Sequence, residues 1–186
     1  MNILLHICCA NCTCYTLKAL QEKGMKVTGL WYNPNIHPHT EHQKRLMAMG
    51  YYADRMKLPV IYNEEYGLDA WLENVKDKHY PAEQRCCICY RMRIKEAAKT
   101  AKEQGFDCFS TTLLYSKKQN SLLIKNICEE MSKEYGVAFY FENFDLGWKE
   151  GIGISRDMGL YRQQYCGCIF SEKEKYSVAT KKEKKD

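Results

Sequence analysis

The sequence predicts a single α/β domain in which helices flank a mostly parallel sheet. Three observations favour this class. The 186 residues suffice for one domain with a substantial core. Short segments rich in branched and aromatic residues alternate with longer segments of helical character. Several helical segments also end at a glycine, a residue that readily stops a helix. Such alternation is typical of a sheet built from β-α-β units.

The first elements are expected between residues 2 and 32. Residues 2–7 are mainly apolar and are predicted to form a strand. Residues 15–23 are predicted to form a helix that ends at Gly24. Residues 26–32 carry branched and aromatic side chains and are predicted to form the second strand. The proline- and histidine-rich loop NPNIHPH follows it.

The middle of the chain continues the alternation. Thr40 and Gln43 have the spacing of a capping box, so a helix is expected from there to about residue 58. Residues 59–62 are predicted to form a short third strand, and residues 69–76 a helix.

The last elements follow the same order. A helix is expected at residues 85–104, a strand at 106–111, a helix at 121–135 and a fifth strand at 137–142. A glycine follows each of the two helices. No repeat or internal linker is evident in the sequence.

Composition limits the class of protein. Hydrophobic residues make up 45% of the chain and charged residues 27%, as in ordinary globular proteins. No apolar run approaches the roughly 20 residues of a membrane span, and no basic segment precedes the first apolar run as in a signal peptide. We therefore expect a cytoplasmic protein, with one α/β domain at residues 1–180 and a charged, disordered tail at residues 181–186.

The chain has 11 cysteines, and disulfides rarely persist in the cytoplasm. Cys108 lies in an apolar strand and Cys128 on an apolar helical face, so both are predicted to be core residues. The other nine occur in three groups: Cys8, Cys9, Cys12 and Cys14; Cys86, Cys87 and Cys89; and Cys166 and Cys168.

The first group follows the first predicted strand. Parallel sheets bind ligands outside the carboxyl ends of their strands. Nucleotide-binding sheets place a glycine-rich turn after the first strand, but here no glycine occurs between Leu4 and Gly24. The pattern indicates a metal site on a nucleotide-binding type of scaffold.

The spacing leaves the metal open. Cys9 and Cys12, like Cys86 and Cys89, have the two-residue gap of zinc sites, but the pairs are far apart for a compact zinc ribbon. A long-range zinc clasp is one alternative. Nine thiols exceed the needs of one zinc ion, however, and iron–sulfur clusters also take thiolate ligands. Two neighbouring metal centres fit the count better than one.

Four motifs in this order, LLHICCANC, RCCICYRMR, FSTTLLYSKKQN and LYRQQYCGCIFSE, resemble the epoxyqueuosine reductases of the QueH type. The resemblance runs from the first strand to about Glu172. It implies a HUP-like nucleotide-binding fold and an oxidoreductase that reduces the epoxide of epoxyqueuosine to the alkene of queuosine at the wobble position of tRNA. That reaction is the last step of queuosine biosynthesis. The resemblance also implies a [4Fe–4S] cluster and an additional mononuclear iron.

The implied metal ligands match cysteines of this chain. We expect Cys9, Cys86, Cys89 and Cys166 to hold the cluster, and Cys8, Cys12 and Cys168 to hold the second iron. The chain departs from the family's CCAPC motif because Asn11 replaces the proline, and Cys14 and Cys87 are extra thiols.

Expected contacts with the tRNA are less specific. The net charge of +5 permits tRNA binding. Base stacking is expected from aromatic residues at the end of the second strand, Trp31 and Tyr32, although both also fit a buried core. Hydrogen bonds are expected from the loop after the fourth strand, at Ser116, Gln119 and Asn120. Arg162 is expected to bind phosphate, with Tyr161 and Tyr165 beside it. Candidate proton donors are Asp157, His37 and His39.

Two alternatives differ in class. An iron–sulfur tRNA thiolase would need a glycine-rich ATP loop, which the sequence lacks, and a zinc-stabilised RNA-binding module would have no catalytic role. The reductase also requires an external electron donor, and we expect it to act as a monomer.

Overall fold

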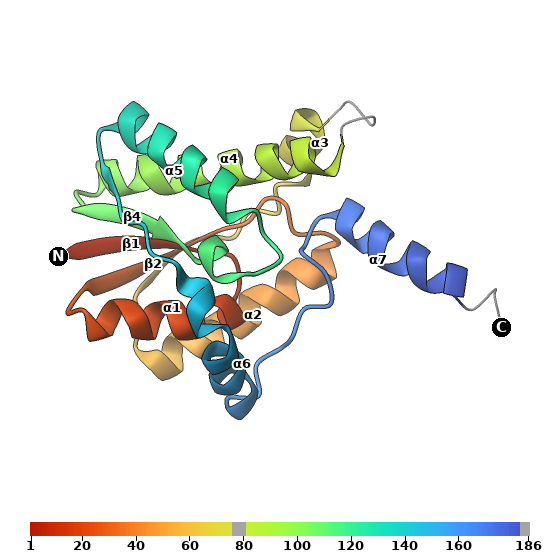
Figure 1. The fold of residues 1–186 in the computed structure, drawn as a ribbon, viewed down its shortest axis with the longest axis horizontal. Helices are drawn as coiled ribbons and strands as arrows, with labels where there is room; N and C mark the ends of the chain where they lie inside the picture. Colours follow the sequence, from red (N-terminus) through yellow and green to blue (C-terminus); the bar gives the residue numbers. More distant parts are fainter. Residues whose placement is uncertain (76–80, 183–186) are drawn as a thin grey trace.

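The computed structural model describes residues 1–75 and 81–182, and its fold is of the predicted α/β class. Five parallel strands form one sheet in the order β3-β2-β1-β4-β5 (Figure 1). The strands are β1 (Asn2–Ile7), β2 (Lys26–Tyr32), β3 (Val60–Asn63), β4 (Cys108–Thr111) and β5 (Ala138–Phe139). The chain builds one half of the sheet from β1 to β3 and the other half from β4 onward. The carboxyl ends of β1 and β4 therefore form the switch point at which such sheets bind ligands.

Helices cover both faces of the sheet. Figure 1 shows α4 and α5 on one face and α1, α2 and α6 on the other, while α7 extends away from the body. The helices of the described residues are α1 (Ala10–Glu22), α2 (His39–Met56), α3 (Leu68–Asn74), α4 (Ala82–Glu103), α5 (Ser121–Tyr135), α6 (Trp148–Asp157) and α7 (Ile169–Lys182), with short 3₁₀ turns η1 (Thr112–Tyr115) and η2 (Phe144–Gly147).

The central strand β1 is wholly buried after its first residue. Both faces are covered by helices, which is why its sequence is a nearly continuous apolar run. The polar exception is His6, whose pKa is lowered to about 3 by burial, so its ring is neutral. One ring nitrogen lies 2.9 Å from the hydroxyl of Thr111 in β4, and the other lies 3.2 Å from the carbonyl oxygen of Tyr32 in β2. A neutral histidine therefore ties together three strands at the edge that carries the site.

Helix α1 begins earlier than predicted. It starts at Ala10 rather than at residue 15, because no glycine or proline interrupts the chain there and the extended residue Cys9 takes the N-cap position. The first cysteine group is therefore not confined to a loop, since Cys12 and Cys14 lie in the helix. Residues three apart share one side of a helix, which brings Cys9 and Cys12 together.

Helix α4 also begins before its predicted start, at Ala82 after Pro81. Cys86 and Cys89 therefore lie three residues apart on one side of a helix. The predicted capping box at the start of α2 is wrong: Pro38 occupies the N-cap position and the helix begins at His39 without a side-chain cap.

Near the C-terminus, three differences from the prediction appear. The fifth strand pairs only over β5, two residues at the edge of the sheet, rather than over 137–142. Helix α6 was not predicted because Gly151 and Gly153 have low helix propensity. Helix α7 includes Lys181 and Lys182 of the predicted tail, and the rest of that tail, residues 183–186, lies outside the described residues.

Candidate metal and substrate site

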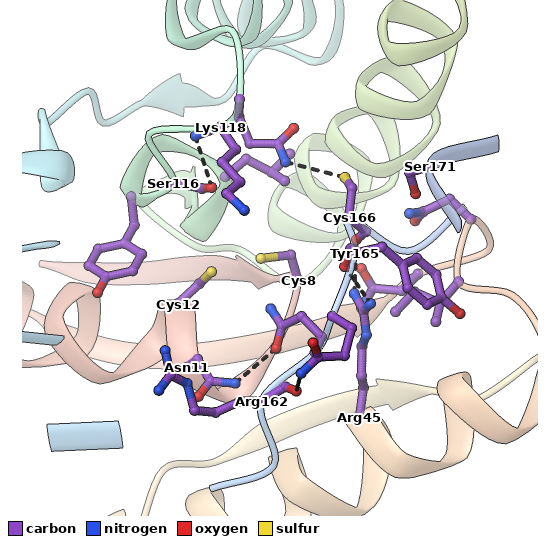
Figure 2. Close-up of a pocket in the computed structure, with 18 of the residues that line it drawn as sticks. Cys8, Asn11, Cys12, Arg45, Ser116, Lys118, Arg162, Tyr165, Cys166 and Ser171 are labelled. Carbon is purple, nitrogen blue, oxygen red and sulfur yellow. Dashed lines mark hydrogen bonds between the residues drawn. The ribbon is translucent and has the colours of Figure 1, made fainter. Parts of the chain in front are cut away.

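A cavity of about 380 Å³ lies at the carboxyl edge of the sheet. Its walls come from the loop after β2, the start of α1, helix α4, the segment that follows β4, helix α6 and the segment that precedes α7. Figure 2 shows Cys8, Cys12 and Cys166 around this cavity. The three cysteine groups of the sequence therefore meet at one place.

The first group of thiols, which we call the trio, consists of Cys8, Cys9 and Cys12. Their sulfur atoms all lie within 4.8 Å of one another, and those of Cys8 and Cys9 are 3.9 Å apart. Bonds of about 2.3 Å place two thiolates on one tetrahedral ion roughly 3.8 Å apart. The spacing of the trio therefore suits a single metal ion.

Hydrogen bonds concentrate negative charge on one member of the trio. Contacts from Cys12 and Cys8 hold the pKa of Cys9 well below its usual range, whereas the contact with Cys8 raises the pKa of Cys12. The side-chain amide of Gln163 donates to the sulfur of Cys9 at 2.9 Å, and the hydroxyl of Thr112 donates to the sulfur of Cys8 at 3.2 Å. Of the three thiols, Cys9 is therefore the one most readily deprotonated, and donors lie next to the trio.

The second group of thiols, the quartet, consists of Cys86, Cys89, Cys166 and Cys168. Burial, followed by the nearby charges of Cys166 and Cys168, raises the pKa of Cys86 to about 11. The same two cysteines contribute to the raised pKa of Cys89, although burial is the main cause. The quartet thus joins two thiols of α4 to two thiols from the far end of the chain.

Two donors face the quartet. The fully buried guanidinium of Arg93 donates to the sulfur of Cys89 at 2.9 Å, and the amide of Gln119 donates to the sulfur of Cys166 at 3.3 Å. Gln119 is itself oriented by the hydroxyl of Tyr90, which donates to its amide oxygen at 2.6 Å. Positive charge and amide dipoles therefore surround sulfur atoms that would carry negative charge when bound to metal.

A buried ion pair fastens residues 161–168, which we call the strap. Arg45 is 3% exposed, and it donates to the carbonyl oxygens of Cys166 and Tyr165, each at 2.9 Å. Its third nitrogen donates to Glu41 at 2.7 Å, and the other oxygen of Glu41 accepts from the hydroxyl of Tyr161 at 2.5 Å. Sequence reasoning missed this pair, because a glutamate four residues before an arginine is ordinary on any helix.

The departure from the CCAPC motif has a structural role. The amide of Asn11 donates to the carbonyl oxygen of Tyr161 at 2.8 Å and to the side chain of Gln163 at 2.9 Å. Its oxygen accepts from the hydroxyl of Ser155 in α6. Asn11 therefore connects the start of α1 to both the strap and α6.

Several predicted site residues line the cavity. These are Cys8, Cys12, Cys86, Cys166, Ser116, Gln119, Arg162 and Tyr165. Arg162 also lines a shallower neighbouring hollow together with Lys118 and Lys175. No other described residue pairs with the guanidinium of Arg162, which is exposed at the rim.

Other predicted site residues are not among the described residues that line the cavity. Trp31 is fully buried in the core beside His42, which fits its core alternative rather than base stacking. Asp157 is exposed at the end of α6. The hydroxyl of Tyr161 donates to Glu41 instead of facing the cavity. The carbonyl oxygen of Tyr32 accepts a hydrogen bond from His6.

The remaining predicted residues make structural contacts near the cavity. The carbonyl oxygen of His37 accepts from the hydroxyl of Tyr165 at 2.5 Å, so its backbone holds the strap. His39 packs against the ring of Tyr66. Asn120 caps helix α5, accepting from the backbone N–H of Leu123 at 3.0 Å, which gives it a structural role.

The cysteines outside the two groups have structural surroundings. Cys108 and Cys128 are buried in the core, as predicted. The thiol of Cys14 is buried in α1 and donates to the carbonyl oxygen of Ala10 at 3.3 Å. All 11 cysteines are free thiols, and Cys87 is only half-buried on α4.

The donor set fits soft metals. Seven thiols, one of them already favoured as a thiolate, are the ligands that iron–sulfur clusters, iron and zinc prefer. Within the described residues, no helix has the length and apolar character needed to cross a membrane.

Comparisons with known proteins give a consistent result. The family model described as "Epoxyqueuosine reductase QueH" matches residues 3–174. A protein of that name from Dehalococcoides mccartyi is 38% identical over 175 residues, which cover 94% of both chains. Another from Thermotoga maritima is 36% identical over 191 residues, covering 97% of both, and one from Staphylococcus epidermidis is 33% identical, covering 91% of this chain and 76% of its own.

Proposed function

Because the chain belongs to the QueH family of epoxyqueuosine reductases, we propose that it reduces the epoxide of epoxyqueuosine to the alkene of queuosine in tRNA. The reaction consumes two electrons and two protons, and the epoxide oxygen leaves as water. The observation that carries the proposal is a cavity at the switch point of the sheet that is lined by cysteines from three distant segments, Cys8 and Cys12, Cys86, and Cys166, with Cys9 close beside Cys8 and Cys12.

We further propose a [4Fe–4S] cluster on the quartet and a single iron on the trio. The close sulfur spacing of the trio supports one ion there, and the quartet offers the four thiolates that a cluster commonly takes. This assignment exchanges Cys9 and Cys168 relative to the partition expected from sequence. Three protein ligands on the lone ion would leave a coordination position for substrate.

When bound, the two iron centres would supply the electrons and a Lewis acid for the epoxide oxygen. The chain's own residues prepare the surroundings. Arg93, Gln119 and Gln163 donate to the sulfur atoms and so stabilise thiolates in a buried site. Arg162 and Lys118 at the rim would hold backbone phosphates, which position a nucleic acid without reading its sequence.

The setting of the reaction is part of the same proposal. The protein would act on tRNA in the cytoplasm, as a monomer, with electrons from an external donor. Asp157, expected as a proton donor, is exposed and away from the described cavity lining, which argues against a direct role.

The test is turnover by the anaerobically reconstituted protein. Reduced with dithionite, it should convert tRNA-bound epoxyqueuosine to queuosine, detected by mass spectrometry as the loss of one oxygen atom. Cys12→Ala, which removes a member of the trio, should abolish conversion while Cys87→Ala retains it. A colourless protein that binds zinc and gives no conversion would contradict the proposal.

A further inference from the structure

We propose that the ring of Trp148, backed by the buried ring of Tyr115, forms the surface on which the target base of the tRNA stacks inside the cavity. The inference deepens the proposed function and rests on it. A modifying enzyme can reach its target atoms only after the base leaves the anticodon stack, and the unstacked base then needs a new partner. Aromatic side chains are the usual partners of such bases.

Trp148 differs from the other tryptophans of the chain. Trp31 and Trp71 are fully buried, with 0% exposure, whereas Trp148 is half-buried and lines the cavity. Trp148 therefore has the accessible ring that the sequence analysis assigned to Trp31. It begins helix α6, which the sequence did not predict.

Tyr115 supports the indole from behind. The two rings are stacked, with centroids 5.2 Å apart and planes inclined by 28°, and the hydroxyl of Tyr115 donates to the carbonyl oxygen of Trp148 at 3.0 Å. A Cβ atom at Gly151 would collide with the ring of Tyr115, and one at Gly147 would collide with Tyr15. The two glycines therefore allow α6 to dock closely, which fixes the aromatic surface in place before substrate binds.

The position of this surface suits a base whose phosphates remain outside. Tyr115 and Trp148 line the same cavity as Cys8 and Cys12 of the trio. The cations Arg162 and Lys118 line both the cavity and the hollow at its rim. A volume of about 380 Å³ is within the usual range for small-ligand pockets, roughly 300–1,000 Å³. A base stacked on Trp148 would therefore lie beside the thiols while its backbone stays at the cationic rim.

The test compares two forms of one tRNA. One carries epoxyqueuosine at the wobble position, and the other is abasic there. Affinities of the reconstituted protein for both are measured by fluorescence anisotropy. Trp148→Ala should weaken binding of the base-bearing tRNA about 5- to 150-fold, the usual effect of removing one base–aromatic stack, and should leave the abasic tRNA unaffected. Trp148→Phe should lose less, because it keeps an aromatic face.

Matched variants distinguish base stacking from a general loss of tRNA binding. Tyr62→Ala removes an aromatic ring that is 37% exposed on β3, away from the cavity, and should change neither affinity. If Trp148→Ala does not fold, Trp148→Leu gives the same contrast with apolar bulk but no aromatic face. Equal losses on both tRNAs, or no loss on either, would overturn the stacking assignment. Failure of the wild-type protein to bind the base-bearing tRNA would instead refute the proposed function.

Discussion

At the scale of single residues, the candidate site depends on side chains that bind no metal. Arg45 is the main example, because one guanidinium holds two strap carbonyls and a buried carboxylate. A lysine has one point of attachment and cannot reproduce this fork of donors. The geometry of the quartet is therefore set partly from α2, an element that carries no cysteine.

We predict that Arg45→Met lowers the free energy of unfolding by about 3–5 kcal/mol, because Glu41 is left buried without its partner. It should also reduce cluster absorption after reconstitution, since Cys166 loses its anchor. Denaturant unfolding and the visible spectrum measure the two effects. Arg55→Met, on the same helix but facing Tyr51, is the control and should change neither.

The double variant Glu41→Gln/Arg45→Met separates charge from anchoring. It should recover part of the stability, because the unpaired charge is gone, but not the cluster absorption. Recovery of both would show that Arg45 acts on stability alone.

The core cysteines give a second prediction at this scale. Cys108→Ala and Cys128→Ala should retain the full iron content and activity, with a stability loss of about 1 kcal/mol from lost packing. Iron analysis and thermal unfolding check this. Loss of iron from either folded variant would show that a metal ligand had been taken for a core residue.

At the scale of elements, the strap and α4 form the quartet together, whereas the trio belongs to the β1–α1 junction alone. The two groups are therefore separable. A chain that ends at residue 164 lacks two thiols of the quartet and keeps all three of the trio.

This truncated chain should bind about one iron and no sulfide, because the trio survives and a four-thiolate cluster cannot form. The full-length variant Cys168→Ala should also contain less sulfide than the wild-type protein, but more than the truncated chain. Iron and sulfide analysis after anaerobic reconstitution makes the measurement. Full iron and sulfide in the truncated chain would place the cluster on other residues.

At the scale of the whole molecule, the parallel sheet provides the carboxyl edge at which the thiols lie. The sequence was sufficient for this level, because apolar strands and glycine-terminated helices are encoded locally; Gly136, for example, ends α5 in the left-handed conformation as expected. The first cysteine group could be assigned to the carboxyl edge on the same basis, whereas the other two groups were expected at the site only from the family resemblance. The contacts of Arg45 and Asn11 could not be predicted, because they join residues more than 100 positions apart. The position of Trp148 could not be predicted either, because it depends on α6, which the glycines in its sequence made hard to recognise as a helix.

Two further predictions concern the whole protein: its content of iron and sulfide, and the dependence of its thermal stability on bound metal. The reconstituted protein should contain about five irons and four sulfides per chain, from one cluster and one ion. Metal removal should lower the melting temperature, since ligands that bind only the folded state stabilise it. The strap should then become the preferred site of proteolysis. Equal amounts of iron and sulfide would refute the second centre.

The long separation of the metal ligands along the chain has a consequence for biosynthesis. The trio leaves the ribosome first, whereas Cys166 and Cys168 follow it by more than 150 residues. A nascent chain therefore presents an incomplete quartet until residue 168 has been made. Under the proposed assignment, delivery of a preassembled cluster would have to wait until Cys168 has emerged, and a chain released before residue 166 could load only the single ion.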